Sequence, residues 1–165
     1  MKIAIISDTH DNLVYIQKVV DWFNENKIKH LIHCGDISTP ETLKKISEIF
    51  KGEVYLVFGN MEIDREKMIG MKENGDLKNV RIYGNCAETK FGEKKIAFTH
   101  KPDSARLLAE SGKYDLVFYG HTHKPWVKKI KNCFLANPGN LSGLFYQATF
   151  AVYDTENDKL ELKIL

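Results

Sequence analysis

The chain has 165 residues, 43% of them hydrophobic and 28% charged, values typical of a globular protein, and we expect a single domain over residues 1–165. Its 24 lysines and arginines nearly balance 22 aspartates and glutamates, and a formal charge of +2 argues against a strongly basic surface for nucleic acids. The 3 cysteines lie far apart and suggest no disulfide framework. The first apolar run, residues 3–6, is too short for a signal peptide or a membrane span, so we expect a cytoplasmic protein.

The first 60 residues alternate between short apolar runs and helical periodicity. Strands are expected at residues 3–6, 31–34 and 54–58, and helices at 13–24 and 39–50 between them. Such an order of strand, helix, strand, helix and strand implies a parallel sheet with right-handed crossovers.

In the remainder of the chain the pattern changes to closely spaced strands. Helices are expected near 65–69 and 104–110, and strands at 80–83, 88–91, 95–99, 116–119, 127–130, 134–136, 148–153 and 160–164. The pairs Gly84-Asn85 and Gly92-Glu93 are interpreted as hairpin turns. The whole pattern predicts an α/β fold in which two facing mixed sheets are flanked by helices.

Seven side chains that can bind a metal stand at the ends of expected strands. Asp8 and His10 follow the first strand, Asp36 the second, Asn60 the third, His100 the strand at 95–99, and His121 and His123 the strand at 116–119. Ligands of open α/β sheets bind at the carboxyl ends of the strands, so these side chains are expected to converge. Histidine and carboxylate without thiolate suit a divalent ion such as manganese, iron, nickel or zinc.

The number and spacing of these residues favour two ions over one. Singly, an Asp-x-His or a Gly-Asp is more often a helix cap or a turn, and only the combination predicts a metal site. Seven ligands are too many for one tetrahedral ion but suit two ions that share a carboxylate, for which Asp36 is the natural bridge. The other two histidines are expected to be structural: His30 begins a strand, and His33 packs or hydrogen-bonds behind Asp36.

These motifs resemble a known family. Asp8-Thr9-His10, Gly35-Asp36, Gly59-Asn60, Thr99-His100 and Gly120-His121-Thr122-His123 resemble, in order, the motifs of the calcineurin-like metallophosphoesterases. The short chain, the segment 32–36 and Asn137-Pro138-Gly139 are similar to the small YfcE-type phosphodiesterase branch. The resemblance, from Lys2 to about Asn140, implies a four-layer αββα sandwich with a dinuclear metal site at the strand ends.

The resemblance also implies roles for the seven residues. One ion would take Asp8, His10, Asp36 and His123, and the other Asp36, Asn60, His100 and His121, with Asp36, Asn60 and His100 acting in catalysis. The implied activity is hydrolysis of a small phosphodiester by a hydroxide that bridges two divalent ions, most typically Mn²⁺ or Ni²⁺, with Fe or Zn as alternatives.

Two positions depart from the family pattern. Met61 stands where nucleases and protein phosphatases of the family have a histidine that acts as a general acid, and Lys101 follows His100 where many relatives continue as His-Gly-His. We expect Lys101 to face solvent. Glu62 is expected to be an ordinary acidic residue of a polar loop, although it is one alternative donor of the missing proton.

Two other functions stay open, a non-catalytic interaction scaffold of the same fold and a nuclease. The basic cluster of Lys124, Lys128, Lys129 and Lys131 is interpreted as a solvated hairpin rather than a nucleic-acid contact. We expect neither a membrane nor a nucleic acid as a partner, and the sequence leaves open whether the chain forms a homo-oligomer.

Overall fold

A computed structural model describes residues 1–165, in which strands and helices alternate as far as β4 and strands predominate after it. The strands are β1 (Lys2–Ile6), β2 (His30–His33), β3 (Glu53–Leu56), β4 (Val80–Ile82), β5 (Cys86–Phe91), β6 (Lys94–Thr99), β7 (Leu116–Phe118), β8 (Trp126–Ile130), β9 (Cys133–Asn137), β10 (Thr149–Asp154) and β11 (Lys159–Ile164). The helices are α1 (Leu13–Glu25), α2 (Pro40–Ile49), α3 (Arg65–Glu73) and α4 (Pro102–Glu110). None of these helices combines the length and apolar character needed to cross a membrane.

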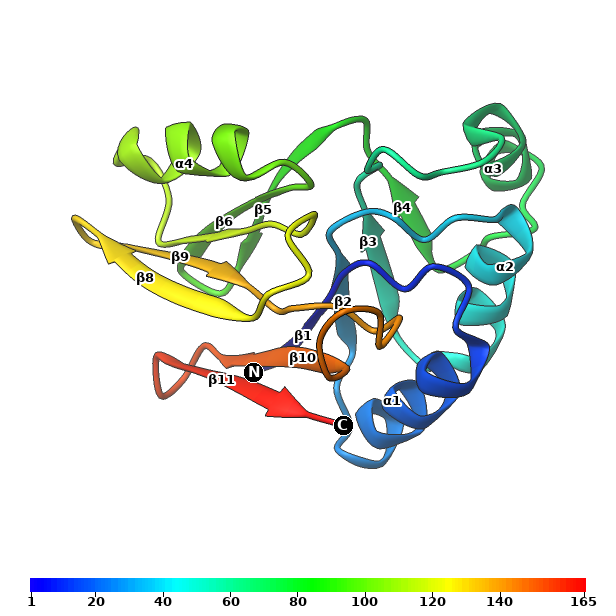
Figure 1. The fold of residues 1–165 in the computed structure, drawn as a ribbon, viewed down its shortest axis with the longest axis horizontal. Helices are drawn as coiled ribbons and strands as arrows, with labels where there is room; N and C mark the ends of the chain where they lie inside the picture. The colour runs from blue at the N-terminus through cyan, green and yellow to red at the C-terminus, as the bar shows by residue number, and fades with distance from the viewer.

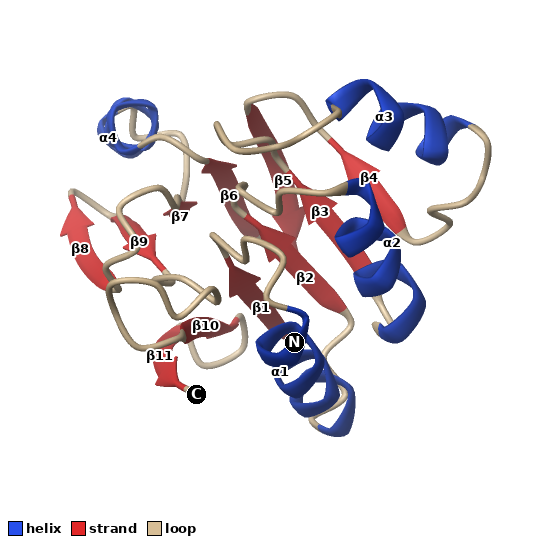
Figure 2. Ribbon diagram, turned by 45° about the vertical axis from the view of Figure 1, so that its right-hand side comes forward, coloured by secondary structure: helices blue, strands red, loops and turns tan.

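The strands form two mixed sheets. The first has the order β11-β10-β1-β2-β3-β4, in which β1 to β4 run parallel, and the second has the order β5-β6-β7-β9-β8, in which β6, β7 and β9 run parallel. Helices α1, α2 and α3 cover the outer face of the first sheet, and α4 covers the second sheet (Figure 1, Figure 2). The predicted four-layer arrangement of two facing sheets between helices is confirmed.

Strand β1 is apolar at each position from Ile3 to Ile6, and the burial of these four residues explains why. Alternate side chains of a strand point to opposite faces, and both faces of the first sheet are buried. Ile3 and Ile5 pack between the two sheets, whereas Ala4 and Ile6 pack under the helices. All four are fully buried.

The loops that leave the parallel strands are held by helix caps. The side chain of Asn12 accepts a hydrogen bond from the Tyr15 N–H at the start of α1. At the start of α2 the Thr39 hydroxyl accepts one from the Thr42 N–H, with Pro40 at the first helical position, as predicted. Each cap fixes the end of a loop that carries candidate metal ligands.

The predicted hairpin at Gly84-Asn85 is wrong. Strand β4 pairs with β3 in the first sheet, parallel and with Val80 opposite Val54, whereas β5 belongs to the second sheet. The segment between them therefore crosses from one sheet to the other. A turn dipeptide indicates that the chain changes direction, but burial of Val80 in the core under the helices decides which strand it joins. The hairpin at Gly92-Glu93, between β5 and β6, is confirmed.

Candidate metal centre

The seven candidate ligands lie together in the loops that follow five strands. Asp8 and His10 follow β1, Asp36 follows β2, Asn60 follows β3, His100 follows β6, and His121 and His123 follow β7. The parallel pairing of β1 with β2 and β3, and of β6 with β7, brings these carboxyl ends to one edge of the sandwich. Their donor atoms form two adjoining groups.

The first group joins the loop after β1 to the loop after β7. The Nε2 atoms of His10 and His123 are 3.3 Å apart, and His123 Nε2 is 3.2 Å from Asp8 Oδ1. Asp36 Oδ2 is 3.8 Å from His10 Nε2. Three donor atoms, from Asp8, His10 and His123, are mutually close enough to surround one ion.

The second group joins the loops after β3, β6 and β7. His100 Nε2 is 3.0 Å from Asn60 Oδ1 and 3.3 Å from Asp36 Oδ2. His121 Nδ1 is 2.9 Å from the same Asn60 oxygen and 3.2 Å from His100 Nε2. Four donor atoms thus converge on a second position beside the first.

Asp36 contacts both groups, and its two oxygens have separate partners. Oδ1 accepts hydrogen bonds from the backbone N–H groups of Asn60 (2.7 Å) and Met61 (2.8 Å). Oδ2 faces His10 of the first group and His100 of the second. Burial acts to raise the pKa of Asp36, but the hydrogen bond and charge of His100 and the two N–H donors lower it to about 2. The carboxylate is therefore ionised at neutral pH, which is the form that binds a cation.

Several candidate ligands have a backbone conformation that is uncommon for residues other than glycine. Five candidate ligands have positive φ angles: Asp8 (51°), His10 (40°), Asp36 (57°), His121 (70°) and His123 (59°). Positive φ is uncommon for residues other than glycine, and strained residues of this kind cluster at functional sites. The tight packing also requires Gly59, because a Cβ there would lie 2.7 Å from the Asp36 nitrogen and 2.9 Å from its Cγ.

Two hydrogen bonds fix the tautomers of histidines at the site. His100 Nδ1 is 2.8 Å from the Cys34 carbonyl, to which it must donate, so Nε2 is the nitrogen that faces Asp36 and that would bind a cation once deprotonated. His33 is buried as expected: its Nδ1 accepts from the Gly35 N–H, and its Nε2 donates to the Thr9 hydroxyl. Burial lowers the pKa of His33 to about 3, so it stays neutral and supports the turn before Asp36.

Glu62 is a structural support of the site that sequence reasoning missed. Its Oε1 accepts hydrogen bonds from the backbone N–H groups of Asp36 (2.6 Å) and Ile37 (3.3 Å). Its side chain is fully buried, and its Oε2 is 3.8 Å from Arg65 Nη2. The carboxylate thus holds the turn that carries Asp36. Met61, by contrast, is 52% exposed. No local pattern in the sequence signals this role of Glu62.

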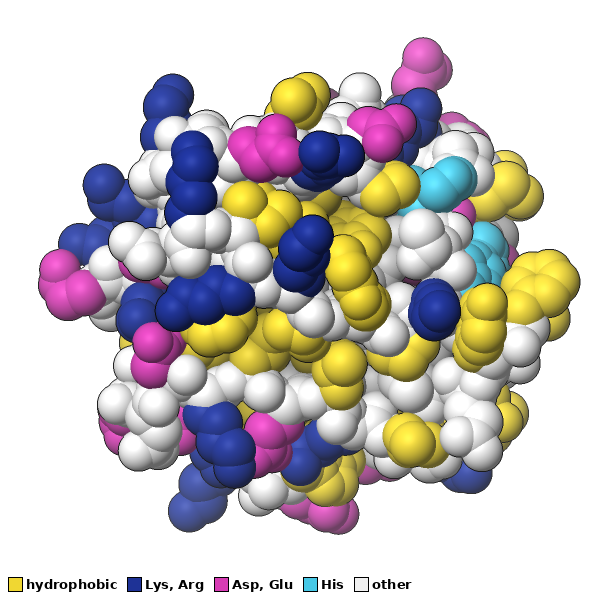
Figure 3. Space-filling view, turned by 60° about the vertical axis from the view of Figure 1, so that its left-hand side comes forward, with side chains coloured by type: hydrophobic (Ala, Val, Ile, Leu, Met, Phe, Trp, Pro, Cys, Tyr) yellow, Lys and Arg dark blue, Asp and Glu magenta, His cyan; other side chains and the backbone are white.

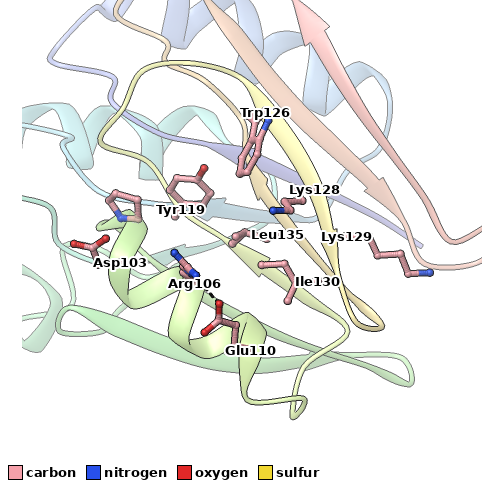
Figure 4. A pocket seen from close by; sticks show the side chains of 10 residues that line it. Asp103, Arg106, Glu110, Tyr119, Trp126, Lys128, Lys129, Ile130 and Leu135 are labelled. Carbon is pink, nitrogen blue, oxygen red and sulfur yellow. Dashed lines mark hydrogen bonds and ion pairs between the residues drawn. The ribbon is translucent and has the colours of Figure 1, made fainter.

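In the basic cluster predicted from the sequence, Lys124 directly follows the candidate ligand His123, whereas Lys128 and Lys129 lie on β8 and Lys131 in the turn to β9. Figure 3 shows a face on which lysine and arginine side chains border an apolar patch, with histidine side chains at its right-hand side. Lys131 donates to the Glu110 carbonyl (2.7 Å), and Lys129 lies 5.4 Å from the centre of the Phe134 ring. Lys128 lines a cavity of about 530 Å³ between α4 and β8, together with Trp126 (Figure 4), and none of the seven candidate ligands lines it.

Similar structures support the fold. An archaeal phosphodiesterase described as novel superposes with a TM-score of 0.91, at 28% identity and over 100% of both chains. Vps29 from Chaetomium thermophilum superposes with a TM-score of 0.72 at 16% identity, over 100% of this chain and 96% of that one. At that identity the second likeness concerns the fold alone.

Similar sequences identify the family. Phosphodiesterase MJ0936 of Methanocaldococcus jannaschii is 30% identical over 159 residues, which are 94% of each chain. Phosphodiesterase YfcE of Escherichia coli is 23% identical over 159 residues, 86% of this chain and 80% of that protein. These names agree with the predicted enzyme class, a phosphoric diester hydrolase, and with the predicted YfcE-type branch. Residues 1–158 match the calcineurin-like phosphoesterase superfamily domain, and the chain belongs to this family.

Proposed function

We propose that the chain is a metal-dependent phosphodiesterase that hydrolyses small phosphodiesters at a pair of divalent ions. The observation that carries the proposal is the position of Asp36 Oδ2, which lies 3.8 Å from His10 Nε2 and 3.3 Å from His100 Nε2. One carboxylate oxygen thereby faces both groups of donors, as a bridging ligand must. Asp8, His10, Asp36 and His123 would hold one ion, and Asp36, Asn60, His100 and His121 the other.

The donor set fits such ions. Imidazole nitrogens with carboxylate and amide oxygens, and no thiolate, suit borderline or hard divalent metals, so Mn²⁺ and Ni²⁺ are proposed ahead of iron and zinc. Magnesium fits less well because it prefers oxygen ligands and keeps several of its waters. Bound ions would lower the pKa of a water molecule that serves as the nucleophile and would neutralise charge on the phosphate.

The residues of the chain prepare the site for this chemistry. The Asn60 Oδ1 atom faces His100 and His121, which leaves the Asn60 amide N–H groups free to donate a hydrogen bond to a phosphate oxygen. His100 is oriented by the Cys34 carbonyl, and Asp36 is held ionised by its hydrogen bonds. These fixed dipoles and charges need little reorganisation when the negative charge of the transition state shifts.

The two alternative functions have less support. A non-catalytic scaffold has no need of a complete set of seven metal donors, and the chain has all seven. A nuclease must expel a poor alkoxide leaving group, and Met61 offers no proton at the position where nucleases of the family have a histidine.

The test is a panel of phosphomonoesters and phosphodiesters assayed after chelation and after addition of each divalent metal. We expect the chelated protein to be inactive, Mn²⁺ or Ni²⁺ to restore activity best, and diesters to be preferred. At saturation, metal analysis is expected to find two ions per chain. If the reconstituted protein hydrolyses no ester, or holds at most one ion, the proposal is wrong. Single- and double-stranded DNA in the same panel test the nuclease alternative.

A further inference from the structure

A cavity of about 570 Å³ has Asn60 and His100 in its wall and is therefore continuous with the candidate metal centre. Its other walls come from the start of α3, from the segment that crosses between the sheets, and from the turn between β6 and α4. The volume lies within the range of small-molecule pockets. The cavity can therefore receive one of the two ester groups of a bound phosphodiester.

Two cationic side chains, Arg65 and Lys101, line this cavity, and none of its lining residues is acidic. The Arg65 guanidinium is held in place: it lies 5.1 Å from the centre of the Phe58 ring and donates a hydrogen bond to the Gly59 carbonyl. The buried Glu62 carboxylate, 3.8 Å away, balances part of its charge. Lys101 is exposed and belongs to no ion pair, so its charge is uncompensated.

The rest of the lining is mostly polar. Asn85, Thr99 and Ser104 contribute amide and hydroxyl groups, and only Phe58 and Cys86 contribute apolar side chains. The Thr99 hydroxyl donates to the Asn85 carbonyl (2.7 Å), but an apolar ester group would leave the Asn85 amide and the Ser104 hydroxyl without partners, which costs free energy. A phosphorylated group would instead form charge-assisted hydrogen bonds with the two cations.

We propose that this cavity binds a second phosphate, carried by one ester group of the substrate, so that the enzyme prefers diesters bearing an additional phosphate. The inference rests on the proposed phosphodiesterase function and defines its substrate class. Lys101 supplies the free charge that attracts the second phosphate, and the fixed Arg65 guanidinium supplies a planar set of donors. The departure from the family pattern at Lys101 is then a determinant of specificity.

The kinetic test compares two p-nitrophenyl nucleoside 5′-phosphodiesters that differ only in a 3′-phosphate. We expect kcat/KM to be about tenfold higher for the diester with the 3′-phosphate, the effect of one charge-assisted hydrogen bond. Lys101→Ala is expected to remove most of this preference. Lys128→Ala is the matched control, because Lys128 is an exposed lysine that lines a different cavity, and it is expected to keep the preference. Equal kcat/KM values for the two diesters, or equal effects of the two substitutions, would overturn the inference.

A second test needs neither metal nor activity. Cys86 lines the cavity and is exposed, whereas Cys34 and Cys133 are buried, so alkylation of the folded protein reports on Cys86. In chelated protein, inorganic pyrophosphate is expected to slow alkylation by the neutral reagent iodoacetamide several-fold. This protection is expected to be lost in Lys101→Ala and kept in Lys128→Ala.

The two tests separate the inference from the proposed function. Protection of Cys86 in a protein that hydrolyses no diester would support the anion site and contradict the enzymatic function. Hydrolysis of both diesters at equal rates, without protection of Cys86, would support the function and refute the anion site.

Discussion

Substitution of Asp36 by asparagine removes the one oxygen that faces both groups of donors and leaves the surrounding structure intact. In the native protein the backbone N–H groups of Asn60 and Met61 donate to Asp36 Oδ1 at 2.7 and 2.8 Å. The carbonyl oxygen of the asparagine can still accept these two hydrogen bonds. Its amide NH₂ would replace Oδ2, the atom near His10 and His100. An amide nitrogen does not ligate a cation, so both of the proposed ions would lose a donor at once.

The expected loss of activity is large. Charge stabilisation by metal ions is worth several kcal/mol, and about 4 kcal/mol corresponds to about 10³-fold in rate. Asn60→Asp is the matched comparison: it keeps an oxygen toward His100 and His121 and concerns one ion, so we expect a smaller loss, about tenfold.

The assay is kcat for bis(p-nitrophenyl) phosphate at saturating Mn²⁺, with metal content measured after gel filtration and folding checked by circular dichroism. We expect Asp36→Asn to fold normally while binding fewer than two ions. A variant that kept two ions and activity within tenfold of the wild type would refute the assignment of Asp36 as the bridge. Equal losses in Asp36→Asn and Asn60→Asp would refute it as well.

Three further predictions concern other parts of the site. Gly59→Ala should abolish metal-dependent activity and lower the melting temperature, because the added Cβ would collide with Asp36. Gly84→Ala is the control: a Cβ there meets nothing within 4 Å, so activity and melting temperature should stay unchanged. Because the pKa of His33 is lowered to about 3 in the folded state, the unfolded state takes up the proton first and stability falls as pH drops below about 6.5. In urea unfolding of the chelated protein, the difference in free energy of unfolding between wild type and His33→Gln should therefore shrink by about 2 kcal/mol from pH 7 to pH 5. A difference that stays constant over this range would contradict a buried, neutral His33. Since Met61 offers no proton, the rate of hydrolysis of substituted aryl diesters should rise steeply as the leaving-group pKa falls. Met61→His should raise the rate for alkyl diesters more than for aryl diesters. A rate that does not depend on leaving-group pKa, with the chemical step rate-limiting, would disprove the absence of a general acid.

The sequence by itself determined the order of strands and helices and the residues of the candidate site. Apolar runs bounded by caps and turns are local signals. The strand at Ile3–Ile6 and the start of a helix at Pro40 could therefore be predicted from their neighbouring residues alone. Asp8, Asp36 and Asn60 could be predicted to meet because parallel strands carry their carboxyl ends to the same edge. That geometric rule needs only the strand order, which the sequence supplies.

Only the tertiary structure decided which distant segments touch. The segment at Gly84-Asn85 crosses between sheets because burial of Val80 under the helices overrides a local turn signal. Glu62 supports Asp36 across 26 residues of sequence, and no periodicity connects the two positions. Lys101 looked like an ordinary surface lysine until folding placed it in the wall of a cavity shared with His100. Local patterns report how each residue is buried, whereas contacts between loops depend on the packing of the whole chain, which no local pattern encodes.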